Sequence, residues 1–461
     1  MKILKNLKLI TVNSNISILD AIKKITEHEC RVLLVLKNKK IYGYLQEGDI
    51  KRALVQKKFT LKTKIFKILN KKPFVVKNNL SLKDKIKKLK DNARLRAPIT
   101  DIDNNITGLI YFSNFDNLYK GQNLYFKNSK KKRVLLVGGA GYIGSVLAKM
   151  LLKLNYYVII YDLFKFGYKS ISNIKKNKNL KVIKGDSGDT KKILKIAFGI
   201  DAIVDFSGIV GDPACELDPT KTIAENYFKS KNLAEVAKLL QIQRYVFISS
   251  CSVYGLSSGR RQINEKTKEN PISLYAECKL NCEKEILKLK EKNFCPTILR
   301  LATVFGYSPR QRFDLVANIF TLLVAQNKSI RVFGGKQFRP NVHVYDAAKA
   351  INLVLEAPIK KVKNQIFNVG CNKLNLRILD LAKIILKHSK SSNLKVEKDI
   401  TDNRDYHVNF DKIRKILKFK TKFNISTGTK ELYKAIKSKK CKVESKESYS
   451  NYNRELKELY N

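Results

Sequence analysis

The sequence lacks paired cysteines. Its eight cysteines are scattered along 461 residues without any CxxC spacing. Cys278 and Cys282 lie one helical turn apart, but no histidine or second cysteine pair accompanies them. Zinc sites need closely spaced ligands, and disulfide frameworks belong mainly to short secreted chains. We therefore expect neither a metal site nor a disulfide framework.

Long apolar runs are absent as well. No apolar run reaches the roughly 18 residues that a membrane-spanning helix needs. Lysines interrupt the apolar residues of the N-terminus, Met-Lys-Ile-Leu-Lys-Asn-Leu-Lys, too often for a signal peptide. The expectation is a soluble, cytoplasmic protein with no membrane partner, and the length leaves room for two or more domains.

Acidic residues are scarce, with 40 Asp and Glu against 92 Lys and Arg, which gives a formal net charge of +52. Such an excess can indicate a nucleic-acid partner, because basic proteins gain affinity by neutralising phosphates. However, only 17 of the basic residues are arginine, and the lysines are spread evenly along the chain. Phosphate and base recognition favours clustered arginine. We interpret the excess as a compositional bias and expect no nucleic-acid partner, although anionic ligands would still be attracted to clefts.

Residues 1–122 contain a weak internal repeat. In the first half, an amphipathic helix that begins at Ser17 precedes apolar strands at 32–36 and 41–45. In the second half, a helix that begins at Ser81 precedes strands near 97–99 and 106–111. Each half thus predicts a capped helix followed by a strand hairpin.

This repeat, with Gly-Tyr-Leu-Gln-Glu-Gly-Asp-Ile ending at 50 after the second strand, resembles a cystathionine-β-synthase-type (CBS) domain pair. The resemblance implies an adenine nucleotide as a partner, with Asp49 holding a ribose hydroxyl. The matching residue of the second half is Asn114, and the usual Ser or Thr three residues earlier is Gln46 in one half and Tyr111 in the other. Two interpretations remain open, a nucleotide sensor and a structural or dimerising module.

Three further segments follow the repeat. Residues 123–132 are charged, end in three lysines and predict a linker. Residues 133–440 predict a catalytic domain. Residues 441–461 are polar, and we expect a frayed tail there.

The catalytic segment opens with a pattern typical of dinucleotide binding. A buried strand at 133–137 precedes Gly138, Gly141 and Gly144, a helix reaches 154, and a second strand ends on Asp162. Glycines permit a tight turn and a close approach of the backbone to pyrophosphate, which the helix N-terminus faces. Tyr142 and Ile143 belong to the same loop and are predicted to contact the cofactor.

Acidic and small residues at later strand ends extend this predicted cofactor site. Asp162 would accept hydrogen bonds from the adenosine ribose and repel a 2′-phosphate, which predicts NAD over NADP. Asp186 would accept from the adenine amino group, with Ser187 beside it; the alternative is that Asp186 caps a helix. Ser207 is small enough for the cofactor to lie against the backbone.

Tyr275 and Lys279 lie four residues apart and share one face of a predicted helix. An ammonium near a phenol lowers the phenol pKa, so this pair predicts a general base. Together with the glycine loop, Asp162, Asp186 and Ser250 in Ser-Ser-x-x-Val-Tyr-Gly, it resembles an extended short-chain dehydrogenase/reductase of the NAD-dependent nucleotide-sugar epimerase/dehydratase family.

The resemblance covers 133 to about 437 and implies an α/β fold. This fold is a Rossmann-type doubly wound parallel sheet with a smaller C-terminal substrate lobe. It also implies NAD as cofactor, a nucleotide-diphosphate sugar as substrate and a homodimer. Tyr275 would take a proton from a sugar hydroxyl while hydride leaves the same carbon, Lys279 would lower the tyrosine pKa, and Ser250 would donate to the same oxygen.

The reaction that follows oxidation stays open. Dehydratases of the family carry Asp-Glu directly after the catalytic Ser or Thr, whereas this chain has Cys251 and Ser252, which disfavours dehydration. We expect an epimerase that acts through a keto sugar. The alternatives are a one-way dehydrogenase or reductase and, further away, a sensor without chemistry.

The resemblance also implies substrate contacts, from Asn318, from Arg339 to the nucleotide diphosphate and from Arg404. We expect His343 to be a packing residue of its strand. Asp205 stands where relatives often have histidine.

Overall fold

We analysed a computed structural model of the chain. It describes residues 2–27, 32–46, 49–50, 53, 59–91, 96–111, 132–255, 262–389, 391–397, 406–441 and 449–460. The chain forms two compact units, Met1–Leu124 and Tyr125–Asn461. Residues 123–131 of the predicted linker (123–132), Asn114 and Arg404 lie outside the described residues.

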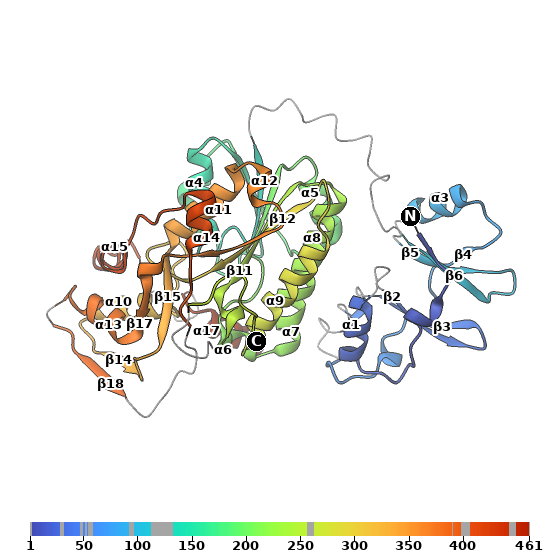
Figure 1. The fold of residues 1–461 in the computed structure, drawn as a ribbon, viewed down its shortest axis with the longest axis horizontal. Helices are drawn as coiled ribbons and strands as arrows, with labels where there is room; N and C mark the ends of the chain where they lie inside the picture. Colours follow the sequence, from blue (N-terminus) through green and yellow to red (C-terminus); the bar gives the residue numbers. More distant parts are fainter. Residues whose placement is uncertain are drawn as a thin grey trace. The chain divides into compact units, whose positions relative to one another are not determined.

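The first unit repeats one arrangement twice (Figure 1). Its elements are β1 (Lys2–Leu4), η1 (Leu7–Ile10), α1 (Ile18–Glu27), β2 (Val32–Lys37), β3 (Lys40–Gln46), η2 (Ile65–Lys67), β4 (Val76–Lys77), α3 (Leu82–Asp91), β5 (Arg96–Thr100) and β6 (Ile106–Tyr111). The pairs β2–β3 and β5–β6 are both antiparallel, and each follows a helix. The predicted order of helix and hairpin is therefore present in both halves.

The helices of the two halves begin in the same way. The Ser17 hydroxyl accepts the Asp20 N–H at 3.1 Å and donates to the Asp20 carboxylate at 2.6 Å, and Ser81 and Asp84 form the same two bonds at the same distances. Such caps satisfy N–H groups at the start of a helix. The halves are also joined, because β1 from the N-terminus pairs with β6 in the sheet β1-β6-β5-β4.

The second unit is built on a seven-stranded parallel sheet in the order β16-β12-β11-β10-β7-β8-β9. These strands are β7 (Arg133–Val137), β8 (Tyr157–Asp162), β9 (Leu180–Lys184), β10 (Ala202–Asp205), β11 (Arg244–Ser250), β12 (Cys295–Leu301) and β16 (Gln365–Val369). The strand order reverses between β7 and β10, which is the point at which doubly wound sheets bind ligands. The predicted Rossmann-type α/β fold is confirmed.

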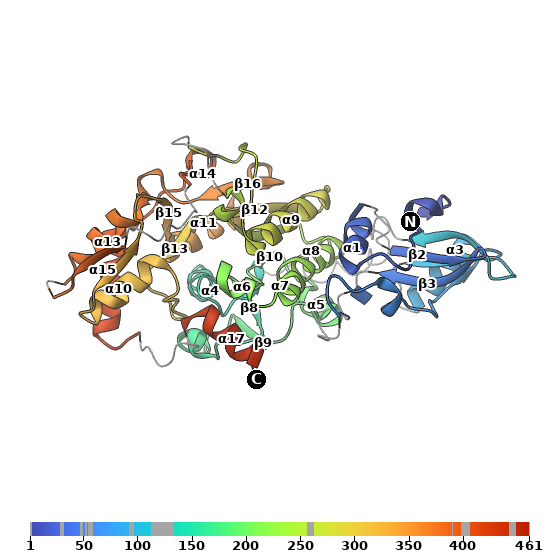
Figure 2. The same ribbon diagram turned by 90° about the horizontal axis from the view of Figure 1, so that it is seen from below.

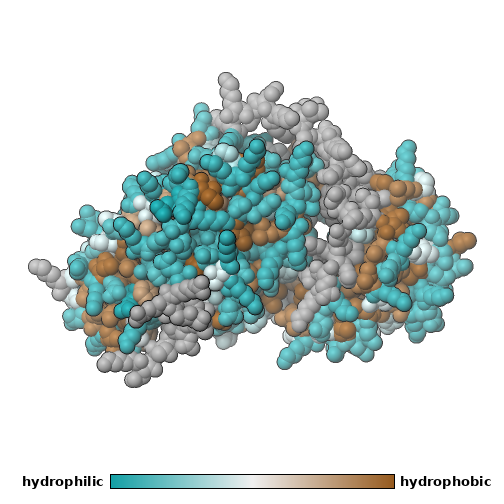
Figure 3. All heavy atoms as spheres, in the orientation of Figure 1, coloured by the Kyte–Doolittle hydropathy of each residue, from teal (hydrophilic) through white to brown (hydrophobic). Residues whose placement is uncertain are grey.

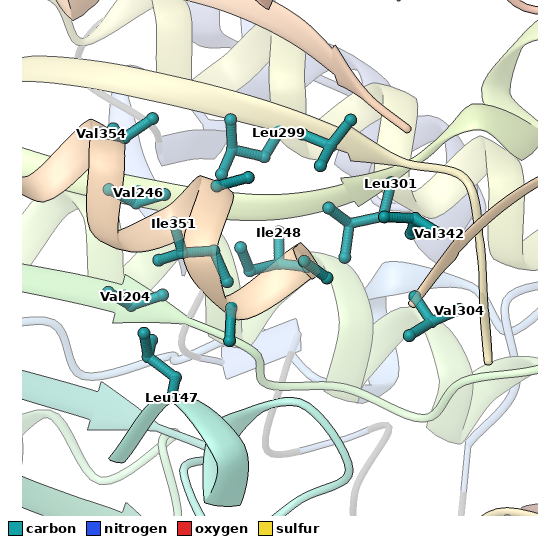
Figure 4. Close-up of a cluster of buried hydrophobic side chains, with 14 of the residues drawn as sticks. Leu147, Val204, Val246, Ile248, Leu299, Leu301, Val304, Val342, Ile351 and Val354 are labelled. Atoms are coloured by element: carbon teal, nitrogen blue, oxygen red, sulfur yellow. The ribbon is translucent and has the colours of Figure 1, made fainter. Parts of the chain in front are cut away.

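Helices cover both faces of this sheet (Figures 1 and 2). On one face, α4 (Gly144–Lys153) contacts α11 (Val344–Glu356). On the other, α8 (Lys229–Leu239) contacts both α5 (Thr190–Ala197) and α9 (Leu274–Lys288). Figure 4 shows the first of these layers, in which Leu147 and Ile351 pack with Val204 and Val246 of the sheet. Burial of such apolar surface is the main force that holds the layers together.

A smaller lobe follows in the sequence and has its own core. It combines the sheet β13-β15-β17 (Thr303–Phe305, Phe338–His343 and Asn375–Arg377) with the pair β14–β18 (Ile330–Phe333 and Leu394–Glu397). Helices α10 (Val316–Ala325), α13 (Ile378–Leu386) and α15 (Ile425–Lys437) contact one another around it. Shorter elements complete the unit, namely η3 (Lys169–Ile174), α6 (Asp212–Glu216), α7 (Pro219–Ile223), η4 (Ala224–Phe228), η5 (Cys251–Tyr254), α12 (Ile359–Val362), η6 (Asn372–Leu374) and α14 (Asp411–Leu417).

The C-terminal segment departs from the expectation of a frayed tail. Asn451–Tyr460 forms helix α17, which contacts α6 (Figure 1), and its Asn451 and Glu455 are buried. Its carboxylates pair with lysines of the same unit: Glu455 lies 3.0 Å from Lys165 Nζ and 2.6 Å from Lys221 Nζ. The polar sequence thus forms a helix whose carboxylates pair with lysines far away in the sequence.

Hydrophilic residues dominate the face of the second unit that Figure 3 presents, as the lysine-rich composition leads one to expect. Of the helices in the described ranges, none combines the length and the apolar character that crossing a membrane requires.

Candidate active site

A cavity of about 510 Å³ lies at the carboxyl ends of the strands, where the strand order reverses. Its wall includes the glycine loop, the ends of β8, β10 and β11, and residues from α9, the loop after β13 and α17. Cavities of a few hundred cubic ångströms are typical of small-molecule sites. Of the predicted site residues, it contains Gly138, Gly141, Tyr142, Ile143, Gly144, Asp162, Ser187, Ser207, Ser250, Tyr275 and Lys279.

The glycine loop fits a dinucleotide. Gly138 has a φ of +75°, and a side chain there would meet the Phe206 carbonyl carbon at 3.1 Å. At Gly144, the first residue of α4, a Cβ would lie 2.7 Å from the Gly139 backbone. The missing side chains leave the backbone accessible and let the start of α4 approach the strand, as pyrophosphate binding at a helix N-terminus requires.

Asp162 lies at the end of β8, as the sequence predicts. Its carboxylate accepts the Ala140 N–H at 2.9 Å and the Phe164 N–H at 2.7 Å, so it is oriented by the glycine loop on one side and its own turn on the other. Desolvation raises its pKa, although these two N–H groups oppose the shift. The carboxylate lies in the cavity wall, where it would discriminate between a ribose hydroxyl and a 2′-phosphate.

The polar residues after β9 make different contacts, and only some of them line the cavity. Ser187 lines the cavity, whereas Asp186 lies 2.7 Å from Nζ of the buried Lys229 and accepts the Gly188 N–H at 2.6 Å. The helix cap after β9 comes from Asp189, which accepts the Lys192 N–H, and not from Asp186. Asp186 therefore forms an ion pair with Lys229, which the sequence analysis did not predict.

Asp205 has a buried carboxylate whose oxygens both accept hydrogen bonds. It is 0% exposed and accepts the Ser207 N–H at 2.9 Å, the Ser207 hydroxyl and the Tyr245 hydroxyl at 2.9 Å. A buried carboxylate is tolerated when its oxygens are satisfied in this way. It orients Ser207, which lines the cavity.

Ser250, Tyr275 and Lys279 meet although they come from different elements. Ser250 ends β11, while Tyr275 and Lys279 share one face of α9 as predicted. Ser250 lies close enough to Tyr275 to lower the pKa of its phenol, and the Ser252 hydroxyl donates to Ser250 Oγ at 2.8 Å. Lys279 is 2% exposed, donates to the Ile248 carbonyl at 3.0 Å and lies 6.0 Å from the centre of the Tyr275 ring.

The pKa of Tyr275 differs from the sequence expectation. Burial raises it well above its usual value, and the nearby Cys215 and Asp212 act in the same direction. Arg312 and the neighbouring Ser250 oppose the shift, whereas Lys279 donates to a backbone carbonyl. Burial, and not Lys279, therefore has the largest effect on the pKa of Tyr275, in contrast to the prediction from the sequence.

Two arginines in the cavity wall were missed by sequence reasoning. Arg310 and Arg312 come from the loop after β13, and Arg312 pairs with Asp314 through two bonds of 3.0 and 2.9 Å. The run Arg-Gln-Arg-Phe-Asp beginning at Arg310 follows a strand end, and that position was the available signal.

Of the residues predicted to contact the substrate, those that the structure describes are not among the residues that line the cavity. Asn318 is fully buried: its Oδ1 accepts the Gly306 N–H at 2.9 Å, and its Nδ2 donates to Tyr142 Oη at 3.0 Å and to the Arg312 carbonyl at 2.8 Å. With its amide used internally, it braces the loop and does not fit the predicted contact with substrate. Arg404 lies outside the described residues.

Arg339 lies behind the cavity. Its guanidinium carbon is 5.5 Å from the centre of the Tyr406 ring, and Tyr406 lines the cavity. His343 is buried and stacks on Phe423 with ring centres 4.0 Å apart, as expected for a packing residue.

The residues after Ser250 carry no acid–base pair. Cys251 is buried, its thiol donates to the Arg300 carbonyl, and burial raises its pKa far above the usual range. Within the described ranges, no cluster of His, Cys, Asp or Glu has the arrangement of a metal site.

A doubly wound parallel sheet, a glycine loop at its switch point and a Ser–Tyr–Lys group at the same edge define a dinucleotide-dependent enzyme of the extended short-chain dehydrogenase/reductase class. The family comparison agrees. The model of the NAD dependent epimerase/dehydratase family matches residues 134–370, and the chain belongs to this family. NAD is its cofactor. A CBS domain model matches residues 4–56, the first half of the N-terminal repeat.

The relatives differ from one another in the reaction for which they are named. The chain is 30% identical to the UDP-glucose 4-epimerase of Lactobacillus helveticus over 54% of this chain and 81% of that protein. It is 27% identical to the dTDP-D-glucose 4,6-dehydratase of Bos taurus over 59% and 76%. The crystal structure of the UDP-glucuronic acid 4-epimerase from Bacillus cereus, in complex with UDP-glucuronic acid and NAD, matches with 26% identity and a TM-score of 0.60, over 66% of this chain and 99% of that one.

Proposed function

We propose that the protein is an NAD-dependent nucleotide-sugar epimerase that acts through a keto-sugar intermediate. The observation that carries this proposal is that Ser250, Tyr275 and Lys279 line one wall of the cavity that the glycine loop also lines, with Lys279 Nζ 6.0 Å from the centre of the Tyr275 ring. When bound, NAD supplies the hydride acceptor and, once reduced, the hydride donor.

In this proposal Tyr275 is the general base. Its phenolate accepts the proton of a sugar hydroxyl, and Ser250 donates a hydrogen bond to the same oxygen as charge develops on it. Lys279 contributes a buried ammonium close to the tyrosine ring. Because burial raises the pKa of Tyr275, the enzyme needs the positive charges of its surroundings to make the phenolate available.

The wall beside Ser250 favours epimerisation over dehydration. Removal of water from the sugar needs an acid and a base next to the catalytic serine. Here those positions hold the buried thiol of Cys251 and the hydroxyl of Ser252, which donates to Ser250. A one-way NAD-linked oxidation or reduction uses the same base and is the second candidate.

A product analysis separates these reactions. The purified protein is tested for co-purifying NAD and then incubated with UDP-glucose, UDP-glucuronic acid and dTDP-glucose, with products followed by mass spectrometry and NMR. Isomers of unchanged mass with retained NAD support the epimerase. Stoichiometric NADH with an oxidised sugar would make it a dehydrogenase, and loss of water would contradict the argument from Cys251 and Ser252.

We also propose that the N-terminal CBS unit binds an adenine nucleotide near Asp49. The Asp49 carboxylate accepts the Gln46 N–H at 3.0 Å directly after β3, which holds it at the end of that strand. Calorimetry of the full chain with ATP, ADP and AMP tests this, with Asp49→Ala as the variant; heats that do not depend on Asp49 would favour a structural module. A homodimer is expected, and light scattering of the purified protein measures it.

A further inference from the structure

Arg310 is an arginine in the wall of the cofactor cavity, and the carboxylates of Asp162 and Asp314 act on it without an ion pair to it among the described residues. It is 5% exposed and lines the cavity. Its guanidinium donates to the Gln311 carbonyl at 3.3 Å and to Asn451 Oδ1 at 2.5 Å, and it lies 3.7 Å from the centre of the Phe166 ring. In the described part of the chain, its hydrogen-bond acceptors are thus neutral oxygens.

The loop that carries Arg310 is bonded to the glycine loop. The Ser308 hydroxyl donates to the Tyr142 carbonyl at 2.7 Å and lies 3.3 Å from Ser145 Oγ. Tyr142 Oη in turn donates to the Gly306 carbonyl at 2.7 Å. Arg310 is therefore held beside the N-terminal turn of α4, the part of the fold that faces a dinucleotide pyrophosphate.

A buried cation without a counter-charge is costly unless an anion joins it. Burial, together with the neighbouring Arg312, lowers the pKa of Arg310 to about 9. Arg312 shows the contrast two residues away, because Asp314 neutralises it through two bonds. Asp314 and Asp162 stabilise the charge of Arg310 only in part, since the hydrogen bonds of its guanidinium go to neutral oxygens. Guanidinium groups suit phosphate oxygens particularly well.

We propose that Arg310 binds the pyrophosphate of NAD and that Asn451, from the C-terminal helix α17, positions it for that task. The inference rests on the proposed function only in requiring NAD as cofactor. It makes the C-terminal helix part of the cofactor site.

Helix α17 is attached around this contact. Asn451 Nδ2 donates to the Val210 carbonyl at 2.9 Å, so the amide joins Arg310 to the loop after β10. One turn further on, Glu455 pairs with Lys165 and Lys221, which come from the segments after β8 and in α7. These contacts of Asn451 and Glu455 together hold the start of α17 against the cavity wall.

The test is calorimetric titration of the full chain, after removal of bound nucleotide, with NAD, ADP-ribose and adenosine. Arg310→Met keeps the apolar stem and should weaken NAD and ADP-ribose by about tenfold or more, with adenosine binding within about twofold of the wild type. Asn451→Asp preserves size but gives Arg310 a carboxylate partner, and should weaken the same two ligands. Arg331→Gln, at an exposed position of β14, is the matched control for loss of a positive charge.

Equal NAD affinity in Arg310→Met, or an equal loss for adenosine, would overturn the proposal. Thermal unfolding of the nucleotide-free variants checks that they fold. If Arg310→Met does not fold, Asn451→Asp still decides the test. The titrations with NAD, ADP-ribose and adenosine all measure binding and not turnover. Failure of the proposed epimerase reaction would therefore leave them unchanged, and failure here would leave the role of Tyr275 untouched.

Discussion

Asn226 forms two hydrogen bonds with the backbone of one residue, Ile209. Its Oδ1 accepts the Ile209 N–H at 2.6 Å, and its Nδ2 donates to the Ile209 carbonyl at 2.8 Å. Ile209 belongs to the loop that lines the cavity after β10 and packs with Cys215 against Tyr275. A single buried amide thus holds the loop that packs against Tyr275.

Replacement of Asn226 by Asp should disturb this loop, because Asp keeps the acceptor but cannot donate to the Ile209 carbonyl. We expect a loss of about 1–3 kcal/mol in the free energy of unfolding and lower turnover. Chemical denaturation and steady-state kinetics measure both. Unchanged stability and turnover in the Asp variant would show that the two bonds do not hold the loop.

A buried ion pair lies directly behind Ser250. Arg300 is 0% exposed and donates to both oxygens of Glu283, which also accepts the Ser249 hydroxyl. Arg300→Met should destabilise the protein by about 3–5 kcal/mol, because Glu283 would remain buried without its partner. The exposed pair Arg414–Asp411 is the control, and Arg414→Met should cost at most about 1 kcal/mol in urea unfolding. Similar losses at both sites would refute the argument from burial.

Asp162 should determine the choice between NAD and NADP. Asp162→Asn removes the negative charge but retains an oxygen that can accept the Ala140 N–H. We expect the affinity for NADP relative to NAD to rise by about tenfold, since repulsion of a 2′-phosphate is lost. Titration with both cofactors measures the ratio, and an unchanged ratio would remove Asp162 from that role.

The attachment of α17 should weaken in acid. Partial burial would raise the pKa of Glu458, but its bonds and charge interactions with Lys165 and Lys221 outweigh that effect and hold the pKa below its usual value. Its contribution to stability is then complete above the unfolded pKa of about 4.3 and is lost as the pH falls through the lower folded pKa. Hydrogen exchange of 451–460 at pH 7 and in acid measures the effect.

Glu458→Gln provides the control for this acid effect. It should raise exchange of the helix at pH 7 and reduce its pH dependence. If the wild-type helix exchanges equally fast at both pH values once the intrinsic rate is taken into account, the ion pairs do not hold it.

Parts of this account follow from local sequence and parts do not. The strand, glycine loop, helix and Asp162 are close in the sequence, and Tyr275 and Lys279 share one helix turn, so local sequence patterns are enough to place them. Asn318 was misassigned because a buried amide and a ligand-binding amide look alike in a sequence. Helix α17 was missed because its partners Lys165 and Lys221 lie more than 200 residues away, and no local pattern encodes such contacts.

The most direct test of the central claim is turnover by Tyr275→Phe, measured with the nucleotide sugar that the wild type converts and with NAD binding determined on the same preparation. The phenyl ring preserves packing against Ile209 and Cys215 but has no hydroxyl to take the proton. We predict a folded protein that binds NAD as the wild type does and loses nearly all turnover. Turnover close to that of the wild type would contradict the assignment of Tyr275 as the general base.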